Sequence, residues 1–479
     1  MSRLWDKGEA LDSLIARFTV GRDPELDLHL VPYDALASAA HAMMLRHIGV
    51  LSATDCGALV AELATIASES RVGRFAILAA EEDAHTAIEN RLTKRLGEAG
   101  RRIHTGRSRN DQVIAALRLF AREALVEQAE ALAALVEELL RRGEELAEVS
   151  LPGYTHTRQA MPSTLGFHFA ACASGLLDAF PWMKTALEHV NRSPLGSASG
   201  FGVALPLDRA LVARLLAFDS VQRNTLAVQN DRGKTEALTL AALLGPVGDL
   251  GRLAADLILL SSDEWRCLTL PAELTTGSSI MPQKRNPDAL ELVRAESSRH
   301  RARLAEIAGV YGPLLCGYHR DLQLTKGPFV EGMRAALDVF HVMRRIVSGL
   351  RVDEERCRTI MQRDIGATDA AYERVAAGMA FRDAYREVGK DPAAAVTGDP
   401  AASWRLRRHE GAPGDRDLSA DWNRLALARQ WVYDARTRFD AAWRLLGERD
   451  SDDTGALRSA APHATMDRDA HAGARDRLS

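Results

Sequence analysis

Residues 113–146 read V-I-A-A-L-R-L-F-A-R-E-A-L-V-E-Q-A-E-A-L-A-A-L-V-E-E-L-L-R-R-G-E-E-L, and this stretch decides the fold. Its apolar residues recur at the three- and four-residue spacing of one helix face. No proline interrupts them. The pattern therefore predicts a single helix of roughly 30 residues, about 50 Å long.

Several other stretches show the same periodicity. Good helix formers (Ala, Leu, Arg and Glu) dominate them, and aromatic residues make up only 5% of the chain. We therefore expect an all-α protein with a central bundle of long helices. Some apolar stripes are wider than one bundle needs, which predicts helices from other copies of the chain. The further helices are expected over 163–190, 225–262, 288–310 and 328–350.

We expect three helical regions followed by a tail. Residues 1–108 form an N-terminal helical domain, 109–351 the central long-helix bundle, and 352–450 a smaller C-terminal helical cap. Residues 451–479 are polar and rich in small side chains, which favours disorder.

Composition excludes several classes of partner. The 479 residues are 46% hydrophobic and 26% charged, as in ordinary globular proteins. A net charge of −4 gives no reason to expect a nucleic acid or a membrane surface as partner. The first residues are charged and no apolar run is long enough, so we expect neither a secretory signal nor a membrane span. The five cysteines form no C-x-x-C pair, so neither a zinc site nor a disulfide framework is indicated, and a cytoplasmic location fits.

Residues 276–287 read T-G-S-S-I-M-P-Q-K-R-N-P and hold much usable chemistry. Ser278 offers a hydroxyl, Lys284 a positive charge and Asn286 an amide. Prolines break helix on either side of the charged part. The stretch therefore predicts a cationic loop between two helices, suited to closing over an anionic substrate. A plain solvated loop is the alternative, but it has no need of the Ile-Met pair beside the serines.

Three other polar segments supply matching chemistry. In H-T-G-R-S-R-N-D-Q (104–112), Ser108 and Arg109 precede the longest helix, where N–H groups and guanidiniums suit a carboxylate. A capped helix with exposed arginines would explain that segment too. The other two segments are Y-T-H-T-R-Q-A-M-P (154–162) and Y-H-R-D-L-Q-L-T-K (318–326).

His156 lies on or beside a turn, because Pro152 and Gly153 come just before it. A single histidine near a turn is more often structural than catalytic. Thr155 beside it could hydrogen-bond an oxyanion. Taken together, the residues alone indicate a helical enzyme for a small molecule with several negative charges.

These segments together resemble the argininosuccinate lyases of the fumarase/aspartase superfamily. The 276–287 loop resembles the superfamily signature, and 104–113 and 318–326 resemble the argininosuccinate lyase versions of their regions. The resemblance covers roughly residues 18–390 and includes further matches at 81–92, 193–200 and 367–382.

The resemblance implies a homotetramer, completed by a bundle of long helices, with active sites built from three subunits. It implies cleavage of argininosuccinate to arginine and fumarate, a step of arginine biosynthesis, with no metal and no organic cofactor. Another fumarate-releasing lyase, acting on adenylosuccinate or an N-acylated argininosuccinate, stays an alternative. So does an inactive, crystallin-like structural homologue.

The resemblance also assigns roles by position. Ser278 and His156 fall on proton-transfer positions, Glu291 on the carboxylate that orients the histidine, and Lys284 on an ammonium that faces the substrate carboxylate. The substrate-binding positions fall on Asn110, Thr155, Asn286, Tyr318, Gln323 and Lys326.

Elimination explains these residue types. Removing a proton beside a carboxylate spreads charge into that carboxylate, and Lys284 and Asn286 could stabilise it. Our hypothesis is that Ser278 is the base and His156 protonates the departing nitrogen. The reverse assignment stays open.

The chain departs from the family at several positions. Arg158 stands where the family usually has glutamine, and Gln159 follows. Ala227 and Gly233 stand where aspartates are common. Near the amino terminus, Thr19 is the candidate for a substrate-binding serine. A C-terminal helix over 420–446 goes beyond the usual pattern, and its aromatic stripe is expected to pack in a core or an interface.

Overall fold

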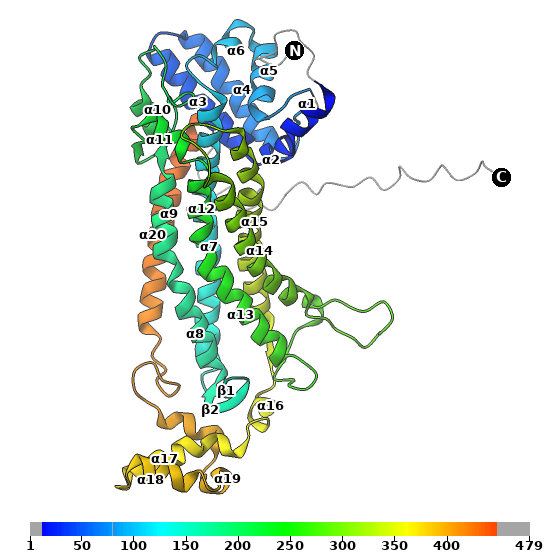
Figure 1. The fold of residues 1–479 in the computed structure, drawn as a ribbon, viewed down its shortest axis with the longest axis vertical. Coiled ribbons are helices and arrows are strands. Elements are labelled where there is room, and N and C mark those ends of the chain that lie inside the picture. The colour runs from blue at the N-terminus through cyan, green and yellow to red at the C-terminus, as the bar shows by residue number, and fades with distance from the viewer. Residues whose placement is uncertain (1–11, 79, 448–479) are drawn as a thin grey trace, which may run out of the picture. The chain divides into compact units, whose positions relative to one another are not determined.

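The computed structural model describes residues 12–78 and 80–447 and is helical almost throughout (Figure 1). The predicted all-α class is confirmed. Within these ranges, strands occur only as short two-stranded pairs and one isolated bridge. No helix in them has the length and apolar character needed to cross a bilayer. The tail predicted to be disordered, 451–479, lies outside the described residues.

The chain divides into two compact units. Unit 1 combines the residues up to Leu117, Ser193–Thr225, and those from Arg438 onward. Unit 2 combines Arg118–Arg192 and Leu226–Thr437. The three regions expected from the sequence stay a prediction.

Unit 1 consists mainly of short helices. Its elements are α1 (Ser13–Val20), α2 (Asp23–Asp27), α3 (Val31–His47), α4 (Ala53–Arg71), α5 (Ala84–Leu96), α6 (Glu98–Arg102), α10 (Arg209–Leu215), β4 (Ser220–Val221) and η5 (Arg444–Leu446). The elements shared between the units are α7 (Arg109–Glu145), β3 (Arg192–Ser193), α11 (Thr225–Asn230) and α20 (Ser419–Trp443).

Unit 2 holds long helices, a hairpin and the C-terminal helices. The long helices and the hairpin are β1 (Ser150–Thr155), β2 (Arg158–Thr164), α8 (Leu165–Leu177), α9 (Ala179–Val190), α12 (Lys234–Ala241), α13 (Leu244–Leu260), β5 (Leu268–Thr269), η1 (Ala272–Leu274), α14 (Asp288–Tyr311), η2 (Arg320–Thr325) and α15 (Lys326–Gly349). The remainder are β6 (Arg351–Val352), α16 (Glu354–Thr359), η3 (Arg363–Gly366), α17 (Ala367–Ala376), α18 (Phe381–Val388), α19 (Pro392–Ala395) and η4 (Pro400–Leu406).

The long helix α7 confirms the prediction made for 113–146, and it runs unbroken for 37 residues. A reciprocal cap fixes its start. The Ser108 hydroxyl accepts from the Asn110 N–H at 3.2 Å, and the Asp111 carboxylate accepts from the Ser108 N–H at 3.0 Å. Two of the N–H groups left over at the helix start are thereby satisfied.

Two of the other predicted helices are interrupted. Pro181 and Pro246 each lie three residues into a new helix, α9 and α13, where a missing N–H is tolerated. Their rings prevent one continuous helix over 163–190 or 225–262. Gly233, with φ +80°, adds a further break between α11 and α12. The helices predicted over 288–310 and 328–350 correspond to α14 and α15.

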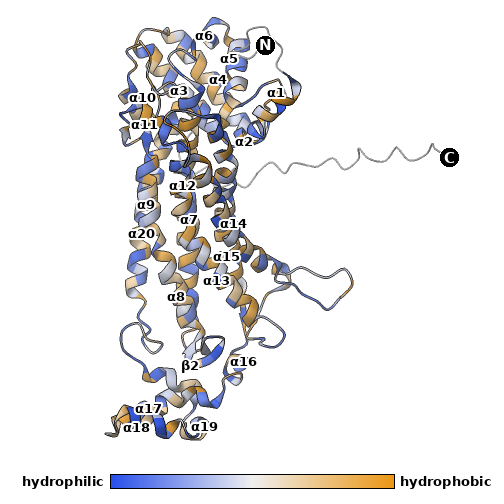
Figure 2. Ribbon diagram, viewed as in Figure 1, coloured by the Kyte–Doolittle hydropathy of each residue, from blue (hydrophilic) through white to orange (hydrophobic). Residues whose placement is uncertain are grey.

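Small residues let the long helices approach closely. A Cβ added to Gly251 of α13 would lie 2.5 Å from the Ser297 hydroxyl of α14. His300, also on α14, is buried and bonds the Leu240 carbonyl at 2.9 Å. Figure 2 shows hydrophobic and hydrophilic residues mixed along these helices, as expected where one face packs inward.

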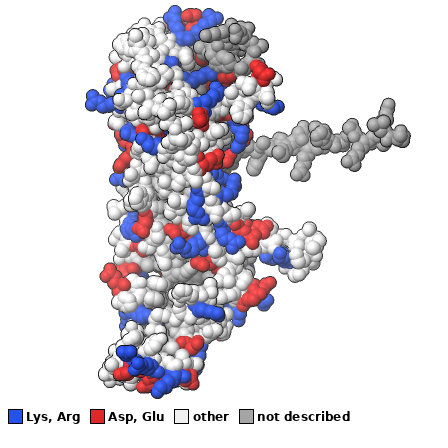
Figure 3. Space-filling view, viewed as in Figure 1, with Lys and Arg blue, Asp and Glu red and all other residues white. Residues whose placement is uncertain are grey.

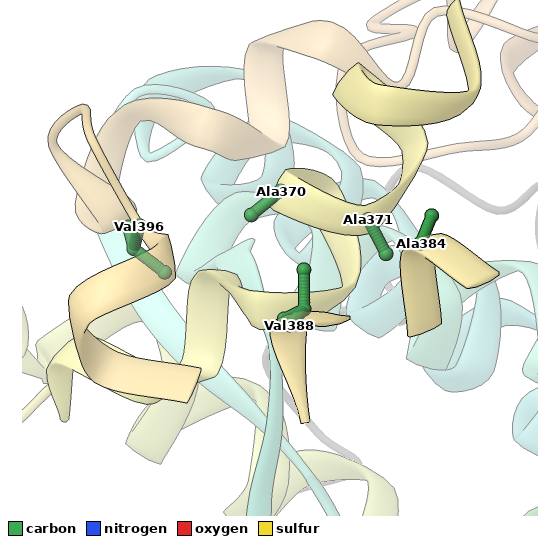
Figure 4. Packing of buried hydrophobic residues seen from close by; sticks show 5 residues of the cluster. All are labelled: Ala370, Ala371, Ala384, Val388 and Val396. Atoms are coloured by element: carbon green, nitrogen blue, oxygen red, sulfur yellow. The ribbon is translucent and has the colours of Figure 1, made fainter. Parts of the chain in front are cut away.

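The C-terminal helix α20 lies antiparallel to α7. Arg429 pairs with Glu137 at 3.0 Å, and Arg436 pairs with Glu130 at 2.7 Å. Residue numbers therefore rise along α20 where they fall along α7. Leu425 and Phe439 are buried, which fits the packing role expected for this helix. Helices α17 and α18 and the residue after α19 share a small apolar cluster (Figure 4). It is made of Ala370, Ala371, Ala384, Val388 and Val396.

Gly251→Ala should lower the free energy of unfolding by about 1–3 kcal/mol, because the added methyl group overpacks the contact between α13 and α14. Gly57→Ala is the matched control. Gly57 also lies inside a helix, α4, but its added Cβ would meet nothing within 4 Å. That change should be neutral or stabilising by up to about 1 kcal/mol. Urea unfolding of both variants measures the difference, and equal effects would contradict the close approach.

Candidate active site

Residues 276–287 form a projecting loop whose two ends are joined by hydrogen bonds. Thr276 and Asn286 exchange two backbone hydrogen bonds, of 3.1 and 2.9 Å. The loop projects from the helices of unit 2 (Figure 1), and Ile280 at its outer end is 83% exposed. The predicted loop between two helices is therefore present. On the face drawn in Figure 3, basic and acidic side chains are interspersed and not gathered by sign.

Ser278 is held by its own loop. Its hydroxyl oxygen accepts from the backbone N–H groups of Met281 at 3.2 Å and Ile280 at 3.4 Å. Two N–H donors directed at one oxygen favour negative charge on that oxygen. The arrangement therefore suits a serine that acts through its alkoxide.

The other polar residues of this loop face outward. The Lys284 side chain is exposed, and its backbone N–H closes a turn onto the Met281 carbonyl at 3.1 Å. The Asn286 side chain donates to the Gly277 carbonyl at 3.4 Å. Glu291 is exposed in the first turn of α14.

His156 forms the turn of the β1–β2 hairpin. The sequence suggested a turn at Pro152 and Gly153, but these residues lie inside β1. The chain reverses at His156 and Thr157, whose φ angles of 52° and 59° lie in the left-handed region. A two-residue turn with φ positive at both positions matches the twist of a hairpin, but it costs strain in residues other than glycine.

The hairpin brings Thr155 and His156 together at its exposed tip. In the described part of the chain, the side chains of His156 and Glu291 have neither an ion pair nor a hydrogen-bond partner. One chain therefore does not show the predicted contact between them.

The hairpin is anchored on two sides next to its tip. The Gln159 side chain donates to the Ile360 carbonyl at 2.7 Å and accepts from the Gln362 N–H at 2.8 Å. The Tyr154 ring lies 5.1 Å from the Trp265 ring, centroid to centroid. Sequence reasoning considered that the Arg158–Gln159 departure changes substrate binding at the histidine region or shifts a local contact by one residue, but it did not predict these partners.

In unit 1, Ser108, Arg109 and Asn110 lie together at the start of α7 and are half-buried. The Arg109 guanidinium lies 3.3 Å from both Glu82 and Asp83. Its charge is therefore already balanced within the unit.

Asp111 ties this segment to a second motif, S-P-L-G-S-A-S-G. One carboxylate oxygen accepts from the N–H groups of Gly196 at 3.1 Å and Ala198 at 2.9 Å. The carboxylate is fully buried, and burial raises its pKa to about 6, while the backbone donors and Arg107 oppose that rise. Sequence reasoning missed this role, although both motifs were visible.

A buried pair lies beside this segment. His85 bonds Asp34 at 2.6 Å. Burial alone would lower the pKa of His85, but the charge and hydrogen bond of Asp34, together with the charges of Asp83 and Asp27, raise it. Burial also opposes ionisation of Asp34, yet His85 and Arg107 hold its pKa below the usual value. Each of the two groups thus favours the charged form of the other.

The 318–326 segment lies between α14 and α15. Tyr318 is partly exposed, Gln323 is half-buried and Lys326 is 2% exposed. The Gly317 N–H just before them donates to the Asn230 side chain at 2.8 Å. These three predicted binding residues therefore share one end of α14.

A helix separates them from the signature loop. Asn286 lies just before α14, and Tyr318 lies just after it. The 24 residues of α14 span about 36 Å. Within one chain, the structure thus groups the predicted residues into separate sets.

The departures at 227 and 233 have a local explanation at Gly233. A Cβ there would lie 2.6 Å from the Tyr311 side chain, and φ is positive, so glycine is required. A carboxylate is supplied nearby by Asp231, which pairs with Arg118 at 3.8 Å and Arg192 at 3.5 Å. Nothing in the structure explains Ala227.

Two further sequence predictions concern Thr19 as a substrate-binding residue and the presence of a metal site. The Thr19 hydroxyl bonds back to the Ile15 carbonyl at 2.9 Å inside α1. Within residues 12–78 and 80–447, no three His, Cys, Asp or Glu side chains are grouped as a metal site.

Comparison with known sequences places the chain among lyases. A sequence profile described as lyase matches residues 9–300. The argininosuccinate lyase of Sorangium cellulosum is 46% identical, covering 87% of this chain and 96% of the relative. That of Xanthomonas campestris is 41% identical, covering 88% and 99%, and that of Phocaeicola vulgatus is 39% identical, covering 86% and 92%.

Solved structures share the fold. An EDDS lyase variant with bound fumarate matches with a TM-score of 0.74 at 22% identity, covering 91% of this chain and 95% of that one. The class II fumarase of Schistosoma mansoni matches with a TM-score of 0.67 at 16% identity, covering 81% and 95%.

Asp111→Asn should remove a pH dependence of stability. The folded protein holds the Asp111 proton more tightly than the unfolded chain, because its pKa of about 6 exceeds the ordinary 3.8. The contribution of this group is therefore fully present below about pH 4 and is lost as the pH rises through about 6. The free energy of unfolding of the wild type, minus that of the variant, should fall by about 3 kcal/mol over this range in urea titrations. A difference that stays constant or grows would show that burial does not raise this pKa.

Proposed function

Because the chain belongs to the argininosuccinate lyase family, we propose that it cleaves argininosuccinate to L-arginine and fumarate in arginine biosynthesis. The substrate rests on the relatives. The mechanism rests on one observation: the Ser278 oxygen receives two backbone N–H groups, in the loop that also carries Lys284 and Asn286.

The first step removes a proton from the carbon next to a substrate carboxylate. Ser278 takes that proton, and the electron pair spreads into the carboxylate, which then carries extra negative charge. Lys284 and Asn286 stabilise this charge in a site from which water is excluded. A serine is a weak base in water, so it needs the donors that the loop provides.

The second step breaks the carbon–nitrogen bond. The electron pair on carbon forms the double bond of fumarate, and the guanidino nitrogen leaves with the bonding electrons. His156 gives that nitrogen a proton, directly or through water. Glu291 orients the histidine. Thr155 and the other binding residues (Ser108, Arg109, Asn110, Asn286, Tyr318, Gln323 and Lys326) hold the substrate.

We propose that four copies assemble and share their sites. Three features support this: α14 keeps Asn286 and Tyr318 apart, the side chains of His156 and Glu291 are exposed, and apolar side chains on the long helices are uncovered. Among the latter, Leu292 of α14 is 69% exposed. A cytoplasmic location fits the five free cysteines.

Ser278→Ala should lower the rate of fumarate release at least ~100-fold, because it removes the base. Ser279→Ala, which changes the neighbouring exposed hydroxyl, should keep most of the rate. Fumarate absorbance in the ultraviolet measures both, with argininosuccinate and then adenylosuccinate as substrate. Release from adenylosuccinate alone would reassign the substrate, and release from neither would favour the inactive homologue.

The Ser278→Ala variant also shows which of Ser278 and His156 is the base and which is the acid. In deuterated water, wild type should exchange the substrate C–H proton, and Ser278→Ala should not. If Ser278→Ala still exchanges this proton, His156 is the base and the assignment is reversed.

If each site is built from several copies of the chain, two inactive variants expressed together should form some active sites. Ser278→Ala and Tyr318→Ala alter opposite ends of α14. When the two variants are expressed together, some sites receive both segments intact, so part of the activity should return. Ser278→Ala with Asn286→Ala is the control, since both alter the same loop and should not recover. Equal activity in the two mixtures would contradict sites built in this way.

A further inference from the structure

The Gln159 side chain has both ends of its amide engaged. Its NH₂ donates to the Ile360 carbonyl at 2.7 Å, and its oxygen accepts from the Gln362 N–H at 2.8 Å. One planar amide thus joins the hairpin to the backbone that follows α16.

The strand register directs Gln159 to this place. Gly153 pairs with Met161, but Tyr154 pairs with Gln159, so Ala160 is an extra residue that forms a bulge. The bulge sets Gln159 opposite Tyr154, three residues from His156. Arg158, next to it, is exposed, and its side chain has no hydrogen bond or ion pair within the described residues.

Tyr154 extends the anchor to a second segment. Its ring packs on Trp265, and Arg356 of α16 donates to the Trp265 carbonyl at 2.7 Å. The part of the hairpin next to its tip, α16 and the chain before β5 are therefore connected. An isolated two-stranded hairpin is marginally stable, so these contacts next to the turn help to hold its tip in place.

We propose that Gln159 is a positioning residue for His156. It sets the height and angle of the strained turn that presents the imidazole, and it does not touch the substrate. The inference rests on the proposed function, in which His156 protonates the leaving nitrogen. A displacement of the acid by about 1 Å can cost about a hundredfold in rate.

The position needs a group that both donates and accepts. Leucine supplies neither, and glutamate keeps only the acceptor, with a negative charge facing the Ile360 carbonyl. Gln159→Leu and Gln159→Glu should therefore both release the hairpin. Arg158→Ala is the control, since it alters the adjacent residue and leaves the amide in place.

The test separates positioning from folding. Both Gln159 variants should lower kcat about 10- to 100-fold with KM changed less than about threefold, and Arg158→Ala should change neither. Because Ser278 still removes the substrate proton, the ratio of C–H exchange to fumarate release should rise in both Gln159 variants. A merely destabilised enzyme would lose exchange and release together. Backbone hydrogen exchange over 150–164 should also quicken.

The outcomes are distinct. Wild-type kcat and an unchanged exchange ratio in the Gln159 variants would overturn the inference while leaving the lyase assignment intact. Parallel loss of exchange and release would assign Gln159 a structural role only. Absence of fumarate from the wild type would remove the proposed function, and the positioning role with it.

Discussion

A rigid α-helix cannot bring its two ends together, and this constraint governs the candidate site. α14 places the 276–287 loop at one end and the 318–326 segment at the other, about 36 Å apart. No rearrangement of side chains can close such a gap. The chain therefore supplies separate sets of chemical groups, each anchored locally, and the proposed function brings them together through other copies of the chain.

Each set has its own local support. The loop closes through the Thr276–Asn286 bridge, which leaves the Ser278 oxygen facing N–H groups. The start of α7 is held by Asp111, which joins two motifs. Gln159 anchors the hairpin. Backbone groups supply much of this support, so it depends little on the choice of neighbouring side chains.

Periodicity predicted the long helices well where nothing interrupted them, as in α7, α14 and α15. It failed at Pro181 and Pro246, which restart helices within patterns that look continuous. The residue types of the candidate site followed from motifs, because the chemistry of an anionic substrate limits the choices. Asp111 and Gln159 could not be found in this way, since their roles depend on contacts with residues far away in the sequence.

The turn at His156 and Thr157 bears on how this protein can be engineered. Left-handed backbone in residues other than glycine costs about 1–3 kcal/mol each. A redesign guided by thermostability alone would place Asn-Gly there and would gain stability by erasing the imidazole. Under the proposed mechanism the most stable sequence of this turn and the active one differ, so thermal melting is a poor guide to improving it.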